Sequence, residues 1–346
     1  MKTLRTKILK IKKLKLFLLV SLLIGWAGCI DKIEFDRPDT IDNGIAIQGK
    51  LVKGNPNRIL VSIRDVFNFK EADKLLNVQS VALINELGQE LLLDSRREGL
   101  YEQVLTDFPI EYEMGYKIKV NTFDNRIFES SYEHILPTPS PTKLIGQFEK
   151  RERVNVIGDI EEIDLIAFKL DTPLKNNEED ANSRMLWELG ITYKVTDYRG
   201  LPCYVDISPF RNYVPFDGTA SSANLIKDIS LYETLPNGLF SGGYYLSVFQ
   251  QSLTETAFDY WSQANVIINR SGSFLEPPVG NIASNLTNIN NPEEKVFGFF
   301  YAVEEKVIRT FISPAFAGFP TQPCAPDPCN CFFLEGSADK PDWWEE

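Results

Sequence analysis

Alternation of apolar and polar side chains is the feature that most constrains the fold of this chain. Apolar residues recur at every second position in 45–51 and 59–63, and the turn signal Gly54-Asn55-Pro56-Asn57 lies between these two segments. A period of two is typical of half-buried β-strands. Further strands are predicted over residues 78–84, 90–93, 100–105, 115–120 and 127–132. Seven short strands with frequent turns predict an immunoglobulin-like β-sandwich over residues 43–136.

A proline-rich segment follows this predicted sandwich. Residues 137–142 read Pro-Thr-Pro-Ser-Pro-Thr. Each proline fixes its own φ and pushes the residue before it out of the helical region. We therefore predict an extended linker at 137–142, which separates the sandwich from a larger C-terminal domain over 143–346.

The second half is predicted to be β-rich with at least one amphipathic helix. Strands are expected over 162–170, 185–196, 244–250 and 296–303, with 307–313 as a hairpin partner of the last. Ser252-Leu253-Thr254-Glu255 has the form of a capping box, and apolar residues then recur at helical spacing as far as Ala264. Trp261 belongs to this stripe, which is typical of core packing; the alternative is the lining of a binding cleft. The fold class is thus mainly β.

The N-terminus has the pattern of a bacterial lipoprotein signal peptide. Seven basic residues precede an apolar run over 16–28 that ends in Trp26-Ala27-Gly28-Cys29. We predict that residues 1–28 are removed and that the sulfur of Cys29 carries a diacylglyceryl group. The alternatives are a plain signal peptide and a transmembrane anchor, although the apolar run is shorter than the roughly 20 residues of a spanning helix.

Charge supports an exported protein and excludes nucleic acid as a partner. The leader holds seven of the 36 basic residues and no acidic one, so the mature chain has 29 basic and 48 acidic residues, a net charge of −19. Such an anion repels nucleic acid. Residues 29–42 form an acidic tether, which resembles the signal that sends lipoproteins of Bacteroidetes to the outer face of the outer membrane. The alternative for the tether is a solvated linker.

Four cysteines remain in the mature chain besides Cys29, and they are Cys203, Cys324, Cys329 and Cys331. An even number in an exported chain indicates disulfides. A Cys329–Cys331 bridge would close a very small ring, which favours one long-range bridge from Cys203 to the C-terminal cluster and one local bridge within it. Free thiols and a zinc site are the alternatives, and zinc is disfavoured because paired C-x-x-C spacing is absent.

Catalytic signatures are missing from the sequence. His134 is the single histidine, and no G-x-S-x-G, H-E-x-x-H, G-x-x-x-x-G-K-[ST] or G-x-G-x-x-G motif occurs. Acidic clusters at 159–164 and 178–180 lack EF-hand spacing and are interpreted as solvated loops. We therefore predict no catalytic residue, no metal site and no cofactor.

Several local motifs occur in a characteristic order along the mature chain. They are Cys29-Ile30-Asp31, Gly99-Leu100-Tyr101, Gly115-Tyr116, Tyr260-Trp261, 272–278, 280–282, 291–300, a Cys-x-Cys segment, and Lys340-Pro341-Asp342-Trp343-Trp344. In this order they resemble the Bacteroidetes outer-membrane lipoprotein family called domain of unknown function 4249. The resemblance implies a surface lipoprotein that assists a TonB-dependent outer-membrane receptor, and it supplies no catalytic residue.

The expected function is that of a non-enzymatic lipoprotein, held in the outer membrane by its lipid anchor and facing the cell exterior. Its expected partner is a TonB-dependent receptor or another outer-membrane β-barrel. The alternative is a module that binds glycan or peptide by stacking on Trp261, Trp343 and Trp344. A hydrolase that uses two carboxylates is the third hypothesis.

Overall fold

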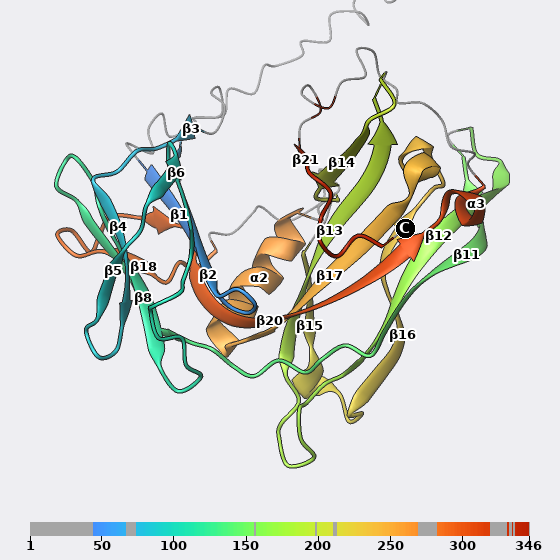
Figure 1. Cartoon of the computed structure of the whole chain (residues 1–346). Helices are drawn as coiled ribbons and strands as arrows, with labels where there is room; N and C mark the ends of the chain where they lie inside the picture. Colours follow the sequence, from blue (N-terminus) through green and yellow to red (C-terminus); the bar gives the residue numbers. More distant parts are fainter. Residues whose placement is uncertain are drawn as a thin grey trace, which may run out of the picture. The chain divides into compact units, whose positions relative to one another are not determined.

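The computed structural model describes the following residues: 44–66, 74–155, 157–197, 199–209, 213–268, 282–318, 331, 334 and 336–345. All of them belong to one compact unit, 42–346. This unit consists of three β-sheets and a few short helices, which confirms the prediction of a mainly β protein (Figure 1). The leader, Cys29 and the tether lie outside the described residues.

The largest sheet has twelve strands and joins the two halves of the sequence. Its hydrogen-bonded order is β21 (Ser337–Ala338), β14 (Pro202–Ile207), β13 (Arg184–Thr196), β17 (Tyr244–Leu253), β20 (Phe300–Ile312), β1 (Gly44–Lys53), β2 (Arg58–Val66), β7 (Leu100–Val104) and β6 (Ser95–Arg97). Three strands flank this path, and they are β15 (Tyr213–Asp217) on β13, β19 (Val296–Phe297) on β1 and β3 (Lys74–Leu75) on β2.

The halves meet where β1 runs parallel to β20, with Gly49 opposite Phe300. A Cβ atom at position 49 would lie 2.8 Å from the Phe300 ring. Glycine at this position therefore lets the Phe300 side chain pack directly against β1.

The first half of the chain forms a two-sheet sandwich with help from the second half. A six-stranded sheet contains β18 (Leu286–Asn288), β9 (Ile127–Ser130), β8 (Gly115–Asn121), β4 (Ser80–Asn85) and β5 (Glu90–Leu92) in this order, with β10 (Glu133–His134) beside β8. The core of the sandwich lies between this sheet and strands β1 and β2. It contains the fully buried side chains of Ile47, Val61, Leu83, Ile118 and Phe128. All seven predicted strands are present, whereas β18, β19 and the start of β20 come from residues beyond 143. The immunoglobulin-like topology stays a prediction.

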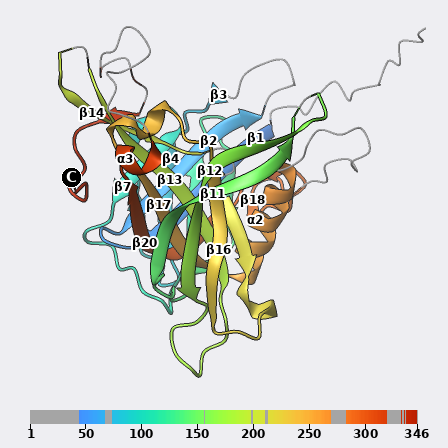
Figure 2. The ribbon, with the colours of Figure 1, turned by 90° about the vertical axis from the view of Figure 1, so that its right-hand side faces the viewer.

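A second core lies between the large sheet and a three-stranded sheet. The small sheet contains β11 (Lys143–Val154), β12 (Ile160–Pro173) and β16 (Leu225–Thr234). It lies against β13, β17 and β20 (Figure 2). Phe168 of β12 and Trp187, Val248 and Ile312 of the large sheet are buried together there. One face of β13, β17 and β20 is thereby covered by apolar side chains.

The predicted hairpin of 296–303 and 307–313 is wrong, because most of these residues form one strand, β20. The charged run at 304–306 has the composition of a turn, but Glu304 and Glu305 are each only 8% exposed and have long-range partners. Glu304 accepts hydrogen bonds from the backbone N–H of Thr138 at 2.7 Å and, through its carbonyl, from the Thr138 hydroxyl at 2.8 Å. Residues 138–139 of the predicted linker are buried by these contacts, and the domain boundary there stays a prediction.

Four short helical segments complete the described fold. They are η1 (Gly218–Ala220), η2 (Gly238–Gly242), α2 (Glu255–Ile268) and α3 (Pro314–Ala317). The predicted capping box starts two residues too early, since Ser252 still belongs to β17 and the Thr254 hydroxyl accepts from the Ala257 N–H at 3.3 Å. Ala257, Trp261 and Ala264 are buried against the sheet, as expected for core packing.

Candidate functional site

The second face of β13, β17 and β20 carries polar and aromatic side chains and holds two pockets. Helix α2 packs at one end of this face through Leu186 and Val303. The C-terminal segment packs at the other end, where Trp344 contacts Tyr245. Phe249 of β17 lines both pockets. We call this surface the open face, in contrast to the covered face that packs on β11, β12 and β16.

The first pocket, which we call the charged pocket, has a volume of about 270 Å³. Lys50 donates from Nζ to Glu188 Oε2 at 2.6 Å and to Glu305 Oε2 at 3.2 Å. Arg58 donates from Nη2 to Glu305 Oε1 at 2.6 Å. The Gln251 amide, which is fully buried, donates to both carboxylates. Two cations and two carboxylates from four different strands are thus fixed in one network.

This network holds Glu188 in its charged form. Burial by itself would raise the pKa of the Glu188 carboxyl, but the Lys50 ammonium and the Gln251 amide outweigh burial, and the net shift is downward. The pKa of the neighbouring Tyr301 phenol lies well above its ordinary value, because the ring is buried and lies near the negative charge of Glu188. At neutral pH the pocket therefore presents an ionised carboxylate and a neutral phenol.

Aromatic rings form one wall of the charged pocket. Tyr213 stacks on Trp261 with ring centroids 4.4 Å apart, and Tyr301 meets the edge of Trp261 at 5.5 Å. Trp261 is 7% exposed. It lines the pocket, but a neighbouring ring already stacks on it, so its main contribution is to hold α2 against the sheet.

The second pocket, which we call the arginine pocket, has a volume of about 330 Å³. The Arg309 guanidinium lies 4.3 Å from the centre of the Trp343 ring. Asp206 accepts a hydrogen bond from the Thr192 hydroxyl at 2.5 Å, and Ser247 contributes a second hydroxyl group to the lining. Trp343 is partly buried and provides one side of this pocket.

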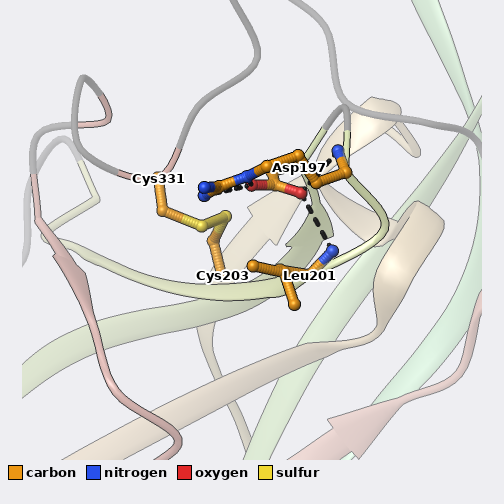
Figure 3. The surroundings of a disulfide bond; sticks show 5 residues. Asp197, Leu201, Cys203 and Cys331 are labelled. Atoms are coloured by element: carbon orange, nitrogen blue, oxygen red, sulfur yellow. Dashed lines mark hydrogen bonds and ion pairs between the residues drawn. A yellow bond between two sulfur atoms is a disulfide. The ribbon is translucent and has the colours of Figure 1, made fainter.

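The C-terminal segment is fixed to the large sheet by a disulfide and by contacts between aromatic rings. Cys203 and Cys331 are bonded, with Cα atoms 5.6 Å apart (Figure 3). β21 pairs with β14, and the Trp344 ring, only 4% exposed, lies 5.0 Å from the Tyr204 ring and 4.8 Å from Tyr245. Trp344 is therefore a packing residue, whereas Trp343 faces a pocket.

The disulfide is the expected long-range bridge. Cys324 and Cys329, for which a local bridge was predicted, lie outside the described residues. The Cys203–Cys331 bridge lies beside the turn in which the Asp197 carboxylate accepts from the Leu201 N–H at 2.9 Å (Figure 3).

Within the described ranges, no group of three histidine, cysteine or acidic side chains is placed to hold a metal ion.

The acidic clusters and the histidine lie apart from both pockets. Glu161 pairs with Arg153, and Glu162 with Lys150, as cross-strand contacts between β11 and β12. His134 lies at the surface, 3.4 Å from Glu86. These residues have structural partners, and neither pocket is lined by them. Among the described helices, none has the length and apolar character needed to cross a membrane.

Comparison with known proteins gives one family match. The family described as a domain of unknown function, DUF4249, matches residues 30–309. The chain belongs to this family. The match confirms the resemblance to this family seen in the sequence, and it includes Lys50, Glu188, Glu305 and Arg309. No curated protein and no solved structure matches the chain significantly.

The sequence reasoning named Trp261 and Trp343, each of which lines one of the pockets, but it missed the charged residues of both pockets. Lys50, Glu188 and Arg309 lie within predicted strands, where they are the polar members of the alternation. Glu305 lies between two predicted strands, in a charged run that was expected to form a turn. A usable signal is present in Glu188, because it is a charged residue in the otherwise apolar run Met185-Leu186-Trp187-Glu188-Leu189. A charged side chain within such a run needs a partner, since burial of an unpaired charge is costly.

Proposed function

We propose that this protein is a non-enzymatic lipoprotein of the outer membrane that binds a partner or ligand at the open face. Anchored by a lipid on Cys29 and facing the cell exterior, it would assist a TonB-dependent receptor or another outer-membrane barrel. The observation that carries the binding role is the pair of pockets flanking Phe249, where charged and aromatic side chains are held rigidly on sheet strands. Rigid elements position binding groups more accurately than loops do.

The charge state of the pockets supports binding rather than hydrolysis. A carboxylate pair that cleaves glycosides needs one carboxyl with a raised pKa to act as the acid. In the charged pocket the pKa of Glu188 is lowered, and Glu305 is held by Lys50 and Arg58. Both carboxylates are therefore occupied by protein cations.

An exposed apolar hairpin tip supports contact with a protein partner. Val154, Ile157 and Ile160 lie at the turn between β11 and β12, and they are 65%, 78% and 71% exposed. Exposed apolar patches mark interaction sites. Next to the tip, cross-strand residue pairs of β11 and β12 form ion pairs, such as Arg153–Glu161, which add charge to this exposed hairpin.

A pull-down from detergent-extracted membranes tests the binding role. We expect the native lipoprotein to capture an outer-membrane barrel, and we expect the Phe249→Ala variant to capture much less of it. Phe123→Ala is the matched control, because Phe123 is an exposed phenylalanine of the turn between β8 and β9, away from both pockets. Equal capture by both variants would move the contact elsewhere, and no captured barrel would contradict the accessory role.

The anchor and the orientation have separate tests. Cys29→Ala should abolish labelling by a palmitate analogue, and continued labelling would contradict the lipid anchor. Protease added to intact cells should degrade the wild-type protein. Protection from protease would place the protein on the periplasmic side instead.

A further inference from the structure

Arg309 differs from the other cations of the open face. Lys50 and Arg58 are both paired with Glu305. Arg309 has no ion-pair or hydrogen-bond partner among the described residues, although its Nε is buried and it lies on the central strand β20. Its contact is the ring of Trp343, 4.3 Å from the guanidinium. Glu305 and Asp206 act on the guanidinium electrostatically, but neither forms an ion pair with it. A partly buried cation without a direct ion pair is costly, and a ligand anion would supply the missing contact.

The surroundings of Arg309 are those of a small polar binding site. The pocket has a volume of about 330 Å³, and its lining includes the hydroxyl groups of Thr192, Ser208 and Ser247. The guanidinium lies over the Trp343 ring, which is a favourable position for a cation. This contact restricts the guanidinium before any ligand binds.

The charges nearby favour a singly charged, planar anion. Arg309 supplies one positive charge, and Asp206, which is hydrogen-bonded to Thr192, supplies one negative charge to the same pocket. A phosphate dianion would meet a single cation and a repelling carboxylate. A carboxylate needs one cation only, and its two oxygens match the fork of an arginine in a bidentate pair.

We propose that the arginine pocket binds a carboxylate group of the ligand, with Arg309 as the bidentate donor and Trp343 as the ring that positions it. This inference rests on the proposed binding role of the open face and specifies the chemistry of its ligand. A peptide C-terminus and an acidic sugar both supply such a carboxylate.

Calorimetric titration with matched pairs of probes tests the carboxylate site. One pair is a tripeptide with a free C-terminal carboxylate and the same peptide as its amide; the other is digalacturonic acid and neutral digalactose. We expect at least one acid to bind and its neutral counterpart to bind about tenfold more weakly or not at all. The acid that binds identifies the source. Inorganic phosphate should compete weakly.

Two variants locate the site. Arg309→Gln should weaken the affinity for the acid about tenfold or more. Arg309→Lys should retain only part of the wild-type affinity, because a lysine cannot form the bidentate pair. Arg153→Gln, a surface arginine on β11, is the control and should bind like wild type. Unchanged thermal unfolding of Arg309→Gln would show that the variant folds.

Three results would overturn the proposal. They are no binding by either acid, equal binding by acid and neutral probes, and tighter binding by phosphate. The pull-down of an outer-membrane barrel is repeated with the Arg309→Gln protein, so that failure of the carboxylate site can be distinguished from failure of the accessory role. If the wild-type protein captures a barrel but binds neither acid, the carboxylate site is contradicted and the accessory role is not.

Discussion

The two faces of strands β13, β17 and β20 use the same backbone for different purposes. Trp187 and Val248 on the covered face are fully buried among apolar neighbours. Glu188 and Phe249, one residue further along each strand, lie on the open face and line the charged pocket. Successive side chains of a strand point to opposite faces. A single set of strands therefore provides both a core that stabilises the fold and a polar surface with pockets.

The largest effect on stability is expected on the covered face. Trp187→Ala removes a fully buried indole whose Nε1 donates to Gln250 at 2.8 Å. We expect a loss of about 3–5 kcal/mol in the free energy of unfolding, measured by chemical denaturation. Phe249→Ala on the open face should cost clearly less, since Phe249 is only partly buried. Equal losses would contradict the division between the two faces.

Lys50→Met tests whether the charged pocket is held by its central cation. The change leaves Glu188 and Glu305 without their shared ammonium group. Removal of one member of a buried ion network costs about 3 kcal/mol. The double variant Lys50→Met with Glu188→Gln should recover part of this loss in thermal unfolding. A double variant that is less stable than the single one would show that Glu188 is stabilised by partners other than Lys50, such as the Gln251 amide.

Cys203→Ser tests how the C-terminal segment is attached beside the arginine pocket. The bridge to Cys331 spans 128 residues of sequence. Its loss should lower the free energy of unfolding by about 2–4 kcal/mol. Cys331→Ser should give the same loss, and the double variant should add nothing further. A larger loss in the double variant would mean that the two sulfurs are not paired with each other.

The smallest expected effect is a change in the dependence of stability on pH. The pKa of Glu188 is lower in the folded protein than its ordinary value of 4.5, so the unfolded chain binds more protons there. The stability that Glu188 contributes is fully present above this value and is lost as the pH falls through the folded-state pKa. Denaturation at several pH values below neutrality should show a flatter acid limb for Glu188→Gln than for Glu162→Gln, a surface control. The same slope in both variants would contradict the role of Glu188.

Local sequence patterns predicted most of the strands and the helix α2. The alternation in residues 45–63 is enough to predict β1 and β2, because a two-residue period follows from strand geometry alone. The stripe of α2 is equally local, and its burial at Trp261 was expected. The resemblance to the family was also visible in the order of its motifs.

The open face depends on contacts between distant residues, which local patterns do not contain. Glu305 is interpreted as part of a turn unless Lys50 and Arg58 are known to lie beside it, and these residues are 255 and 247 positions away. The same contacts decide that β20 continues through its charged run. The pairing of Arg309 with Trp343 likewise requires the C-terminal segment to return to the sheet.

Photo-crosslinking in intact cells tests most directly whether the open face is the binding surface. A photoreactive phenylalanine analogue is placed at Phe249, which lines both pockets, and in a second protein at Phe123, which lines neither. We predict a discrete crosslinked product with an outer-membrane barrel or a surface ligand from position 249 and none from position 123. Products of equal yield from both positions, or a product from position 123 alone, would contradict the proposed binding role of the open face.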